Sequence, residues 1–328
     1  MKQIIKRGSF FTLMFMLLGC LSLYAADNNL ITKQITIEME KAGTLPDRIA
    51  SSKKYNITNL KIIGEINGTD LKMIREMAGS NNTYGKLSVL DLSEARIVEG
   101  GDYYYYNDNI NNYYYTSNDV IGSYAFKGCS RLTSLTLSAG ITEIGKYAFS
   151  DCSGLTSLTI PAGITEIGAW AFEDCSGLTS LTIPAGITEI GSRAFFFCSG
   201  LTSLTLPAGI TWIGSGAFEG CSGLTSLTLS DGITEIGWGA FEGCSGLKEV
   251  RFCINDNLDT YLTKGHPYIG VGCGIKYYIN NKEITSIEIP SNVTTLGKCV
   301  FQGCSGLTSL TLPAGITSIS DGTFRDCI

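Results

Sequence analysis

A segment of 23 residues recurs through most of this sequence, and it constrains the fold more than any other feature. Six copies begin at leucines that are 23 residues apart: Leu132, Leu155, Leu178, Leu201, Leu224 and Leu247. After a 37-residue interval the pattern resumes at Ile284 and Leu307, and looser copies of its core stand at residues 57–62 and 87–92. A unit of this length cannot bury an apolar face alone, so each copy must stack on its neighbours. The sequence therefore predicts a solenoid with one continuous core.

Each unit contains two short extended segments joined by turns. In residues 155–177, leucine and isoleucine alternate with polar residues, which predicts a first strand that ends at Pro161-Ala-Gly163. A second extended segment follows at residues 164–168. We expect eight side chains of this unit, and their equivalents in the other copies, to point into the core: Leu155, Leu158, Ile160, Ile164, Ile167, Ala171, Phe172 and Cys175.

The first 26 residues have the pattern of a secretory signal. Three basic residues precede an apolar run over residues 10–23, and Ala25-Ala26 follows the run. Residues 17–20, Leu-Leu-Gly-Cys, resemble a lipobox, so lipidation at Cys20 and simple cleavage after the alanines both remain open. We therefore expect an exported protein that is secreted or associated with the cell surface and outer membrane.

The rest of the chain divides according to how regular the repeat is. We expect an N-terminal cap and irregular first coil at 27–86, a repeat with a tyrosine-rich insertion (99–119) at 87–131, regular repeats at 132–253, an irregular insertion at 254–283, and final repeats at 284–328. The cap is expected to hold a strand at Ile31–Met39, a short helix begun by a capping box at Thr44–Asp47, and a helix at Asp70–Ala78 that Gly79 ends. In the second insertion, Asn280-Asn281 predicts a hairpin that turns Ile275–Ile279 onto Glu283–Ile287.

The unit at 155–177 resembles the repeat of BspA-like leucine-rich repeat proteins of bacterial surfaces. The resemblance lies in its Leu-x-x-Leu-x-Ile-Pro, Ile-Gly and Ala-Phe-x-x-Cys elements, and it covers about residues 120–252 and 284–328. It implies a curved solenoid, export to the cell surface, and binding of host or community macromolecules such as matrix proteins. With the strands and cap expected from the residues, the fold class is a β-rich leucine-rich repeat solenoid with a small α/β N-terminal cap. The repeat is a scaffold without a binding signature, so it implies no site residues.

Eight of the 12 cysteines fall in one phase of the repeat: Cys129, Cys152, Cys175, Cys198, Cys221, Cys244, Cys304 and Cys327. Stacked equivalent side chains point the same way, whereas a disulfide needs two that face each other and a metal needs convergent ligands. We therefore expect buried free thiols that bond weakly to the turn backbone, with some disulfides as the alternative and no metal site. Cys253, Cys273 and Cys299 lie outside this phase and are the better candidates for a bridge.

Composition excludes several classes of function. The net charge is −6, and no cluster of Lys or Arg follows the N-terminus, which argues against nucleic-acid binding. The single histidine, His266, forms no recognisable triad with Cys253 or Cys273. We therefore expect neither catalysis nor a cofactor.

Aromatic residues at outward positions are the candidate ligand-binding residues. Seven tyrosines lie in the insertion at 99–119, which reads as a binding loop rich in Tyr, Asn and Asp: Tyr103, Tyr104, Tyr105, Tyr106, Tyr113, Tyr114 and Tyr115. The repeats add Tyr147, Trp170, Arg193, Phe196, Phe197, Trp212 and Trp238, all at positions that vary between copies. We expect an extracellular adhesion protein that binds protein ligands through these side chains.

Two alternatives use other surfaces. The first strands carry two outward columns of hydroxyls, represented by Ser157 and Thr159, which would suit glycan binding and equally suit an ordinary strand. The last coil has no cap after Cys327, so its open edge is a candidate surface for self-association.

Overall fold

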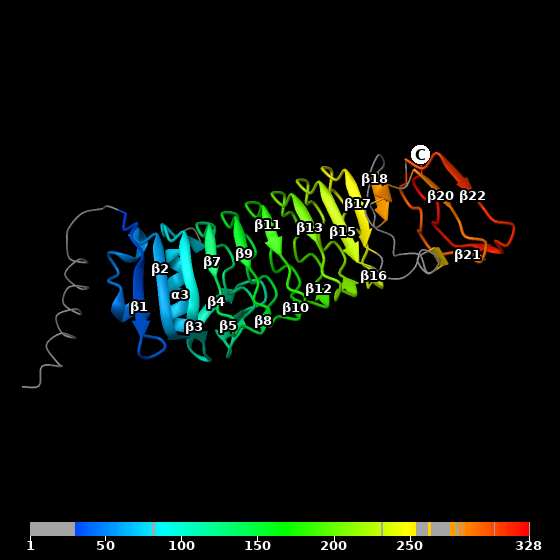
Figure 1. Ribbon diagram of the computed structural model, residues 1–328. Helices are drawn as coiled ribbons and strands as arrows, with labels where there is room; N and C mark the ends of the chain where they lie inside the picture. Colours follow the sequence, from blue (N-terminus) through cyan, green and yellow to red (C-terminus); the bar gives the residue numbers. More distant parts are fainter. Residues whose placement is uncertain are drawn as a thin grey trace, which may run out of the picture.

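The computed structural model of this protein describes residues 30–80, 83–230, 232–253, 262–263, 276–279, 282–283, 285–304 and 306–327. The expected signal segment, Cys20, Cys273 and His266 lie outside these residues. Successive coils stack along one axis, as the repeat predicts, and the chain runs from one end of the stack to the other (Figure 1). No helix within the described ranges is long and apolar enough to cross a membrane.

The first extended segment of each coil contributes one strand to a parallel sheet. One sheet holds β1 (Ile35–Met39), β2 (Asn59–Ile66), β3 (Val89–Ile97), β7 (Ser134–Thr136), β9 (Ser157–Thr159) and β11 (Ser180–Thr182). The series continues with β13 (Ser203–Thr205), β15 (Ser226–Ser230), β17 (Glu249–Cys253) and β18 (Lys276–Ile279). Leu158 pairs with Leu135 on one side and Leu181 on the other, so each strand is in register with its copy 23 residues away.

The second extended segment forms a parallel sheet on another side of the coil. Its strands are β6 (Val120–Ile121), β8 (Glu143–Ile144), β10 (Glu166–Ile167), β12 (Glu189–Ile190), β14 (Trp212–Ile213) and β16 (Glu235–Ile236). The final repeats add two parallel pairs, β20 (Ser286–Glu288) with β22 (Ser309–Thr311) and β21 (Thr295–Leu296) with β23 (Ser318–Ile319). The predicted solenoid of 23-residue coils is therefore confirmed.

The core consists of columns of identical side chains. All eight side chains expected to point inward in residues 155–177 are buried, none more than 4% exposed. The phenylalanine column is a stack of parallel rings, in which Phe172 lies 5.1 Å from Phe149 and 5.0 Å from Phe195 between ring centroids. Because each ring contacts the ring of the next coil, the column couples neighbouring repeats.

Threonine hydroxyls tie the coils together at the surface. Thr156 Oγ1 donates to the carbonyl oxygen of Thr133 at 3.0 Å, and Thr225 Oγ1 donates to that of Thr202 at 2.9 Å. On the second sheet, Thr234 Oγ1 bonds in the same way to Thr211. Each of these threonines directly precedes a strand, and its side chain links its own coil to the preceding one.

The cysteine column consists of free thiols, as expected. Six of the eight Sγ atoms donate to a carbonyl of the preceding coil, for example Cys175 to Phe149 and Cys198 to Phe172, both at 3.1 Å. Cys299 is also buried and forms no disulfide with a described cysteine. The side chain of Cys253 lies outside the described part of the structure.

The N-terminal cap differs in detail from the prediction. Its strand β1 begins at Ile35, and its helices are α2 (Leu45–Arg48) and α3 (Gly68–Met77), with a 3₁₀ turn at Lys54–Asn56. The capping box expected at Thr44 is wrong, because the Thr44 hydroxyl donates to the carbonyl of Lys41. The capping box lies instead at Asn67 and Asp70 of α3.

Asp70 explains this difference, because its carboxylate is buried and serves two elements at once. It accepts hydrogen bonds from the backbone nitrogens of Asn67 at 2.9 Å, Leu45 at 2.8 Å and Gly43 at 2.5 Å. A single carboxylate thus caps α3 and also binds the start of α2, which fastens the two helices of the cap together.

Both predicted insertions contain hairpins. The tyrosine-rich segment is not a loop: it forms β4 (Gly100–Asn107) and β5 (Asn112–Thr116), which pair antiparallel. In the second insertion, β18 turns onto β19 (Lys282–Glu283) as expected. The return strand does not extend to residue 287 as predicted, because Ser286–Glu288 is a separate strand that pairs with β22 in the final repeats.

Candidate functional site: an aromatic ladder on the turn face

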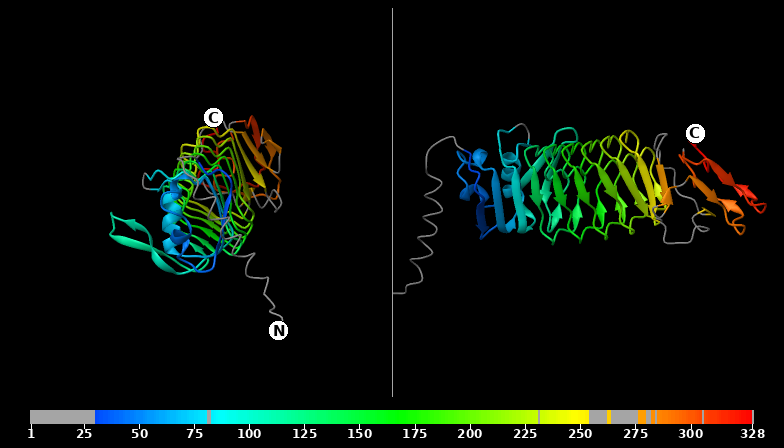
Figure 2. Two further views of the ribbon diagram at one scale, coloured as in Figure 1. Left: turned by 90° about the vertical axis from the view of Figure 1, so that its left-hand side faces the viewer. Right: turned by 45° about the horizontal axis from the view of Figure 1, so that its top comes forward.

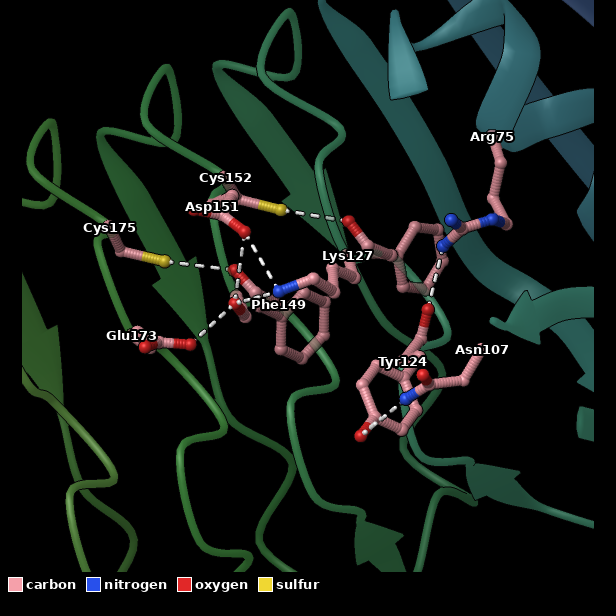
Figure 3. A network of polar contacts seen from close by, with 11 residues as sticks. Arg75, Asn107, Tyr124, Lys127, Phe149, Asp151, Cys152, Glu173 and Cys175 are labelled. Carbon is pink, nitrogen blue, oxygen red and sulfur yellow. Dashed lines mark hydrogen bonds and ion pairs between the residues drawn. The ribbon is translucent and has the colours of Figure 1, made fainter. Parts of the chain in front are cut away.

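The third side of each coil is a turn segment, represented by residues 169–177, and we call this side of the solenoid the turn face. At its N-terminal end, helix α3 occupies the place of the turns. Arg75 of α3 is buried and donates from Nη1 to the carbonyls of Tyr124 at 2.6 Å and Ala125 at 2.9 Å (Figure 3). The helix is thereby joined to the turn of the first regular coil.

The tyrosine hairpin is held against the same side. Figure 2 shows β4 and β5 projecting from the solenoid beside α3. The Tyr104 side chain is buried, its hydroxyl donates to the carbonyl of Ser123 at 2.9 Å, and this burial raises its pKa. Asn107 Nδ2 also donates to the Tyr124 hydroxyl at 3.3 Å (Figure 3). The hairpin is therefore docked onto the first coil at two points.

Rings from the hairpin and from four successive coils form a continuous series, which we call the aromatic ladder. Its members are Tyr105, Tyr114, Tyr124, Tyr147, Trp170, Phe196 and Phe197, together with Arg193. The centroid distances are 4.7 Å from Tyr105 to Tyr124, 5.0 Å from Tyr124 to Tyr147, and 5.7 Å from Tyr147 to Trp170. Phe196 continues the series edge-on to Trp170 at 5.4 Å and contacts Phe197 at 4.4 Å.

Charged side chains lie along the ladder. Lys127 Nζ is 2.9 Å from the Asp151 carboxylate and 5.5 Å from the Tyr147 ring centroid, and it donates to Ser150 (Figure 3). Ser150 in turn donates to Glu173 at 2.9 Å. Partial burial raises the pKa of Glu173 and that of Asp174.

Arg193 contacts two rings of the ladder. Its guanidinium lies 4.8 Å from the Trp170 ring centroid and 5.3 Å from that of Phe196, and Glu219 is 3.7 Å from its Nε. Arginine over aromatic rings is a frequent arrangement at protein interfaces. The turn face thus combines rings with charges of both signs.

The ladder residues adopt a backbone conformation that normally favours glycine. Tyr124, Tyr147, Trp170 and Arg193 have φ between 54° and 63°, and the equivalent residue in the next coil is Gly216. A left-handed conformation costs a residue with a side chain about 1–2 kcal/mol, and it is an outlier for a bulky one. These large side chains are therefore present although glycine would suit the turn better.

Phe197 also has a left-handed backbone, at another position of the turn. Its φ is 54°, and the equivalent positions in other coils are Asp151, Asp174, Gly220 and Gly243. Asp and Gly are the residue types that tolerate this conformation, whereas Phe is not. Phe197 is also 47% exposed, so burial does not offset the cost of its backbone.

This strain can be measured at Tyr147. We expect Tyr147→Ala to lower the free energy of unfolding, because it keeps the backbone cost and loses ring contacts that are worth about 0.5–1.5 kcal/mol each. Tyr147→Gly should be more stable than Tyr147→Ala by about 1–2 kcal/mol, since glycine relieves the left-handed backbone. Urea unfolding of the two variants at neutral pH tests this difference. Equal stabilities would show that the backbone at this position is not strained.

The structure separates the predicted site residues into groups. Tyr103, Tyr106 and Tyr113 form a second cluster on the hairpin, with centroid distances of 4.8 Å and 4.6 Å. Trp212 lies on β14, and Trp238 is 79% exposed; neither ring contacts another described aromatic ring. Tyr115 is likewise exposed, outside the ladder.

Sequence reasoning missed two important residues. Tyr124 lies in the ladder, and it could have been found because it stands 23 residues before Tyr147. Arg75 could not have been found, since no repeat or motif relates α3 to the turn of the first coil. Ser157 and Thr159 are exposed on β9 and have no hydrogen-bonded side-chain partner among the described residues.

No group of three or more His, Cys, Asp or Glu residues in the described part of the chain could hold a metal ion.

Comparison with known proteins supports the repeat assignment. A family model described as BspA type Leucine rich repeat region matches in six copies, over residues 98–199, 143–265 and 274–328. No curated protein matches.

Several solved structures are similar. A leucine-rich repeat protein from Bacteroides ovatus is 18% identical, with 92% of this chain and 70% of that chain covered and a TM-score of 0.47. The T. pallidum Leucine Rich Repeat protein is 23% identical, over 70% and 86% of the two chains, with a TM-score of 0.40. A leucine rich cell surface protein from Faecalibacterium prausnitzii is 22% identical, over 89% and 80%, with a TM-score of 0.37.

Proposed function

This chain belongs to the BspA-type leucine-rich repeat family, and on that basis we propose that it is an exported surface protein that binds other proteins and catalyses no reaction. The N-terminal signal pattern supports export. We place the binding surface on the turn face, along the aromatic ladder and the tyrosine hairpin.

One observation carries this proposal: the ladder's large side chains stand where the fold favours glycine. Tyr147, Trp170 and Phe197 have left-handed backbones, and glycine occupies the equivalent positions further along the array. A repeat under selection for stability alone would keep glycine there. Backbone strain that persists in this way is typical of functional surfaces.

The chemistry of the turn face suits a protein ligand. Aromatic rings and arginine contribute most of the binding energy in protein interfaces, and Trp170, Arg193 and Phe196 are in mutual contact here. Lys127, Asp151 and Glu173 supply charges beside the rings, which favours a specific orientation of the partner.

The buried thiols support a non-enzymatic function. Burial raises the pKa of Cys129 to about 11 and that of Cys244 to about 12. A nucleophilic cysteine needs the opposite shift, because the thiolate is the reactive form. The column is therefore suited to packing.

Binding to immobilised fibronectin, laminin and collagen tests the proposal. The double variant Trp170→Gly/Phe197→Gly removes two ladder rings at positions where glycine suits the backbone. We expect its affinity for the matrix protein that the unmodified chain binds to fall at least about thirtyfold, since an interface hot spot contributes about 2 kcal/mol or more. Circular dichroism should show an unchanged fold.

Two controls locate the binding surface. Trp238→Ser removes an exposed tryptophan outside the ladder, at a position where two preceding copies have serine, Ser192 and Ser215. The pair Thr159→Lys and Thr182→Lys alters the hydroxyl columns of the first sheet. Both controls should keep the affinity, and a loss of binding in the threonine variant alone would assign the surface to the Ser/Thr face.

A further inference from the structure

A polar cavity lies between helix α3 and the tyrosine hairpin, at the N-terminal end of the ladder, where Tyr105 belongs to both. Its volume is about 530 Å³, within the range of about 300–1,000 Å³ that is usual for small-molecule sites. Lys72, Arg75 and Glu76 of α3 form one wall, and residues 103–109 of the hairpin form the other. Side chains from two parts of the chain thus converge on one space.

The walls of this cavity are fixed by contacts outside it. Arg75 joins α3 to the first coil through two hydrogen bonds from Nη1. Tyr105 stacks on Tyr124 at 4.7 Å, and Asn107 bonds to the hydroxyl of the same Tyr124 (Figure 3). The backbone nitrogen of Asp102 also donates to Thr69 Oγ1 at 2.9 Å. The cavity is therefore formed before any ligand enters, which lowers the entropic cost of binding.

The cavity carries an excess of uncompensated positive charge. Arg75 is only 2% exposed, and its Nη2 has no hydrogen-bond partner among the described residues. Neither Arg75 nor Lys72 has a carboxylate within ion-pair distance in the described part of the chain; Lys72 Nζ lies 4.4 Å from the Tyr103 ring centroid. Glu76, the acidic residue of α3 that lines the cavity, is paired with Lys54 at 2.5 Å.

This charge distribution favours an anionic group. The buried Arg75 guanidinium has two backbone carbonyls and the Tyr105 ring, 5.1 Å from its Cζ, as partners but no carboxylate among the described residues. A buried charge without a counter-ion is costly, and an anion in the cavity would offset that cost. Asp108 at the tip of the hairpin is the one other carboxylate among the lining residues, and its side chain is exposed to solvent. The lining therefore has two cationic side chains, Lys72 and Arg75, and two carboxylates, of which Asp108 is solvated and Glu76 is already paired.

The remaining lining indicates what carries the anionic group. Phenol rings supply flat apolar faces, while their hydroxyls, the amides of Asn107 and Asn109 and the Ser80 hydroxyl supply donors and acceptors in several directions. A pyranose ring has the same division, with C–H groups on its faces and hydroxyls at its edge. An aliphatic acid would leave these polar groups without partners.

We propose that this cavity binds a sugar that carries a carboxylate, such as a hexuronic acid unit of a glycan, with Lys72 and Arg75 facing the carboxylate. This cavity adjoins the proposed protein-binding surface, because Tyr105 and the hairpin belong to both, but it contains none of Tyr147, Trp170, Phe196 and Phe197. The protein would then recognise acidic glycans as well as proteins.

Calorimetric titration of the full chain with methyl β-glucuronide and methyl β-glucoside tests the proposal, because the two probes differ only in the carboxylate. We expect the glucuronide to bind at least about tenfold more tightly, and added NaCl to weaken its binding. Lys72→Met should raise the dissociation constant for the glucuronide about tenfold or more. Lys33→Met, which removes the same charge from an exposed position in the cap, should change it less than about twofold.

The other outcomes overturn the proposal. Equal affinity for the glucoside, or no binding of either sugar, would show that the cavity does not recognise a carboxylate-bearing sugar. Equal affinity for acetate or N-acetylaspartate would assign it to carboxylates in general, including acidic peptides.

The variant Trp170→Gly/Phe197→Gly should bind the glucuronide normally, so a failure of this site and a failure of the ladder as a protein-binding surface are distinguished. A glucuronide-terminated oligosaccharide, titrated beside the monosaccharide, separates a free sugar from a glycan end as the source.

Discussion

Raising the pH from about 9 to about 11 is expected to unfold the stacked coils cooperatively, because the folded state holds the protons of its buried thiols. Burial raises the pKa of Cys129 to about 11 and that of Cys304 to about 12, and it keeps that of Cys152 well above the ordinary value. An unfolded thiol ionises near pH 8.5. Between these values the unfolded chain binds fewer protons than the folded chain.

The sign and size of the effect follow from that difference. Below about pH 8.5 both states are protonated, and the contribution to stability is fully present. As the pH rises further, each thiol lowers the free energy of unfolding by up to about 1.4 kcal/mol per pH unit until the folded pKa is reached. Several thiols of one column act together, so the loss should exceed the total stability of about 5–15 kcal/mol that is usual for a folded domain.

Circular dichroism during an alkaline titration measures this transition. The variant Cys175→Ala/Cys198→Ala/Cys221→Ala keeps a small apolar side chain at three buried positions and removes three titrating groups. The pH midpoint of its unfolding should be higher, even though lost packing and the loss of three hydrogen bonds donated by Sγ lower its stability at pH 7. If the pH midpoint of the variant is unchanged, or falls as its stability at pH 7 falls, ionisation of the column is not the cause of unfolding.

Phe195→Ala is expected to lower the free energy of unfolding at neutral pH by about 3–5 kcal/mol. The Phe195 ring is fully buried and stacked between Phe172 at 5.0 Å and Phe218 at 5.1 Å. Alanine would leave a cavity in the middle of the array and remove contacts with both neighbouring coils. Because a solenoid is stabilised by interfaces between neighbours, this loss should also make the array unfold less cooperatively.

Phe197→Ala is the matched control, because it changes the same residue type two positions away in the same coil. Phe197 is 47% exposed, so its loss should cost less than about 1 kcal/mol in urea unfolding. Similar losses in the two variants would mean that the phenylalanine column does not couple the coils.

The repeat predicted the main body of the fold because the spacing of the repeat also sets the register of its strands. Leu135, Leu158 and Leu181 are 23 residues apart, so they pair directly when one coil stacks on the next. The burial of Phe172 and Cys175 followed from the same alignment. Elements outside the repeat had no such constraint. The box expected at Thr44 failed because a carboxylate 26 residues later, Asp70, binds the backbone on both sides of it.

Most residues of the candidate site were predicted one by one, with Tyr124 as an exception in the ladder, but their arrangement was not. Tyr147, Trp170 and Phe197 stood out because they vary where the repeat allows variation. Their left-handed backbone could not be inferred, since the glycines of other copies occur both where the turn needs them and where neighbouring backbones approach closely. The tyrosine insertion was expected to be a loop, and its pairing as a hairpin against α3 depends on contacts such as that of Tyr104 with Ser123.

The sequence by itself determined the solenoid, its 23-residue coil and its core columns, including the cysteine column, because a periodic sequence leaves one way to stack its apolar residues. Only the tertiary structure decided that α3 continues the turn face, that the hairpin docks there, and that Arg75 is buried beside a polar cavity. These features join parts of the chain that no repeat relates, so they depend on distances and burial that exist only in the folded state.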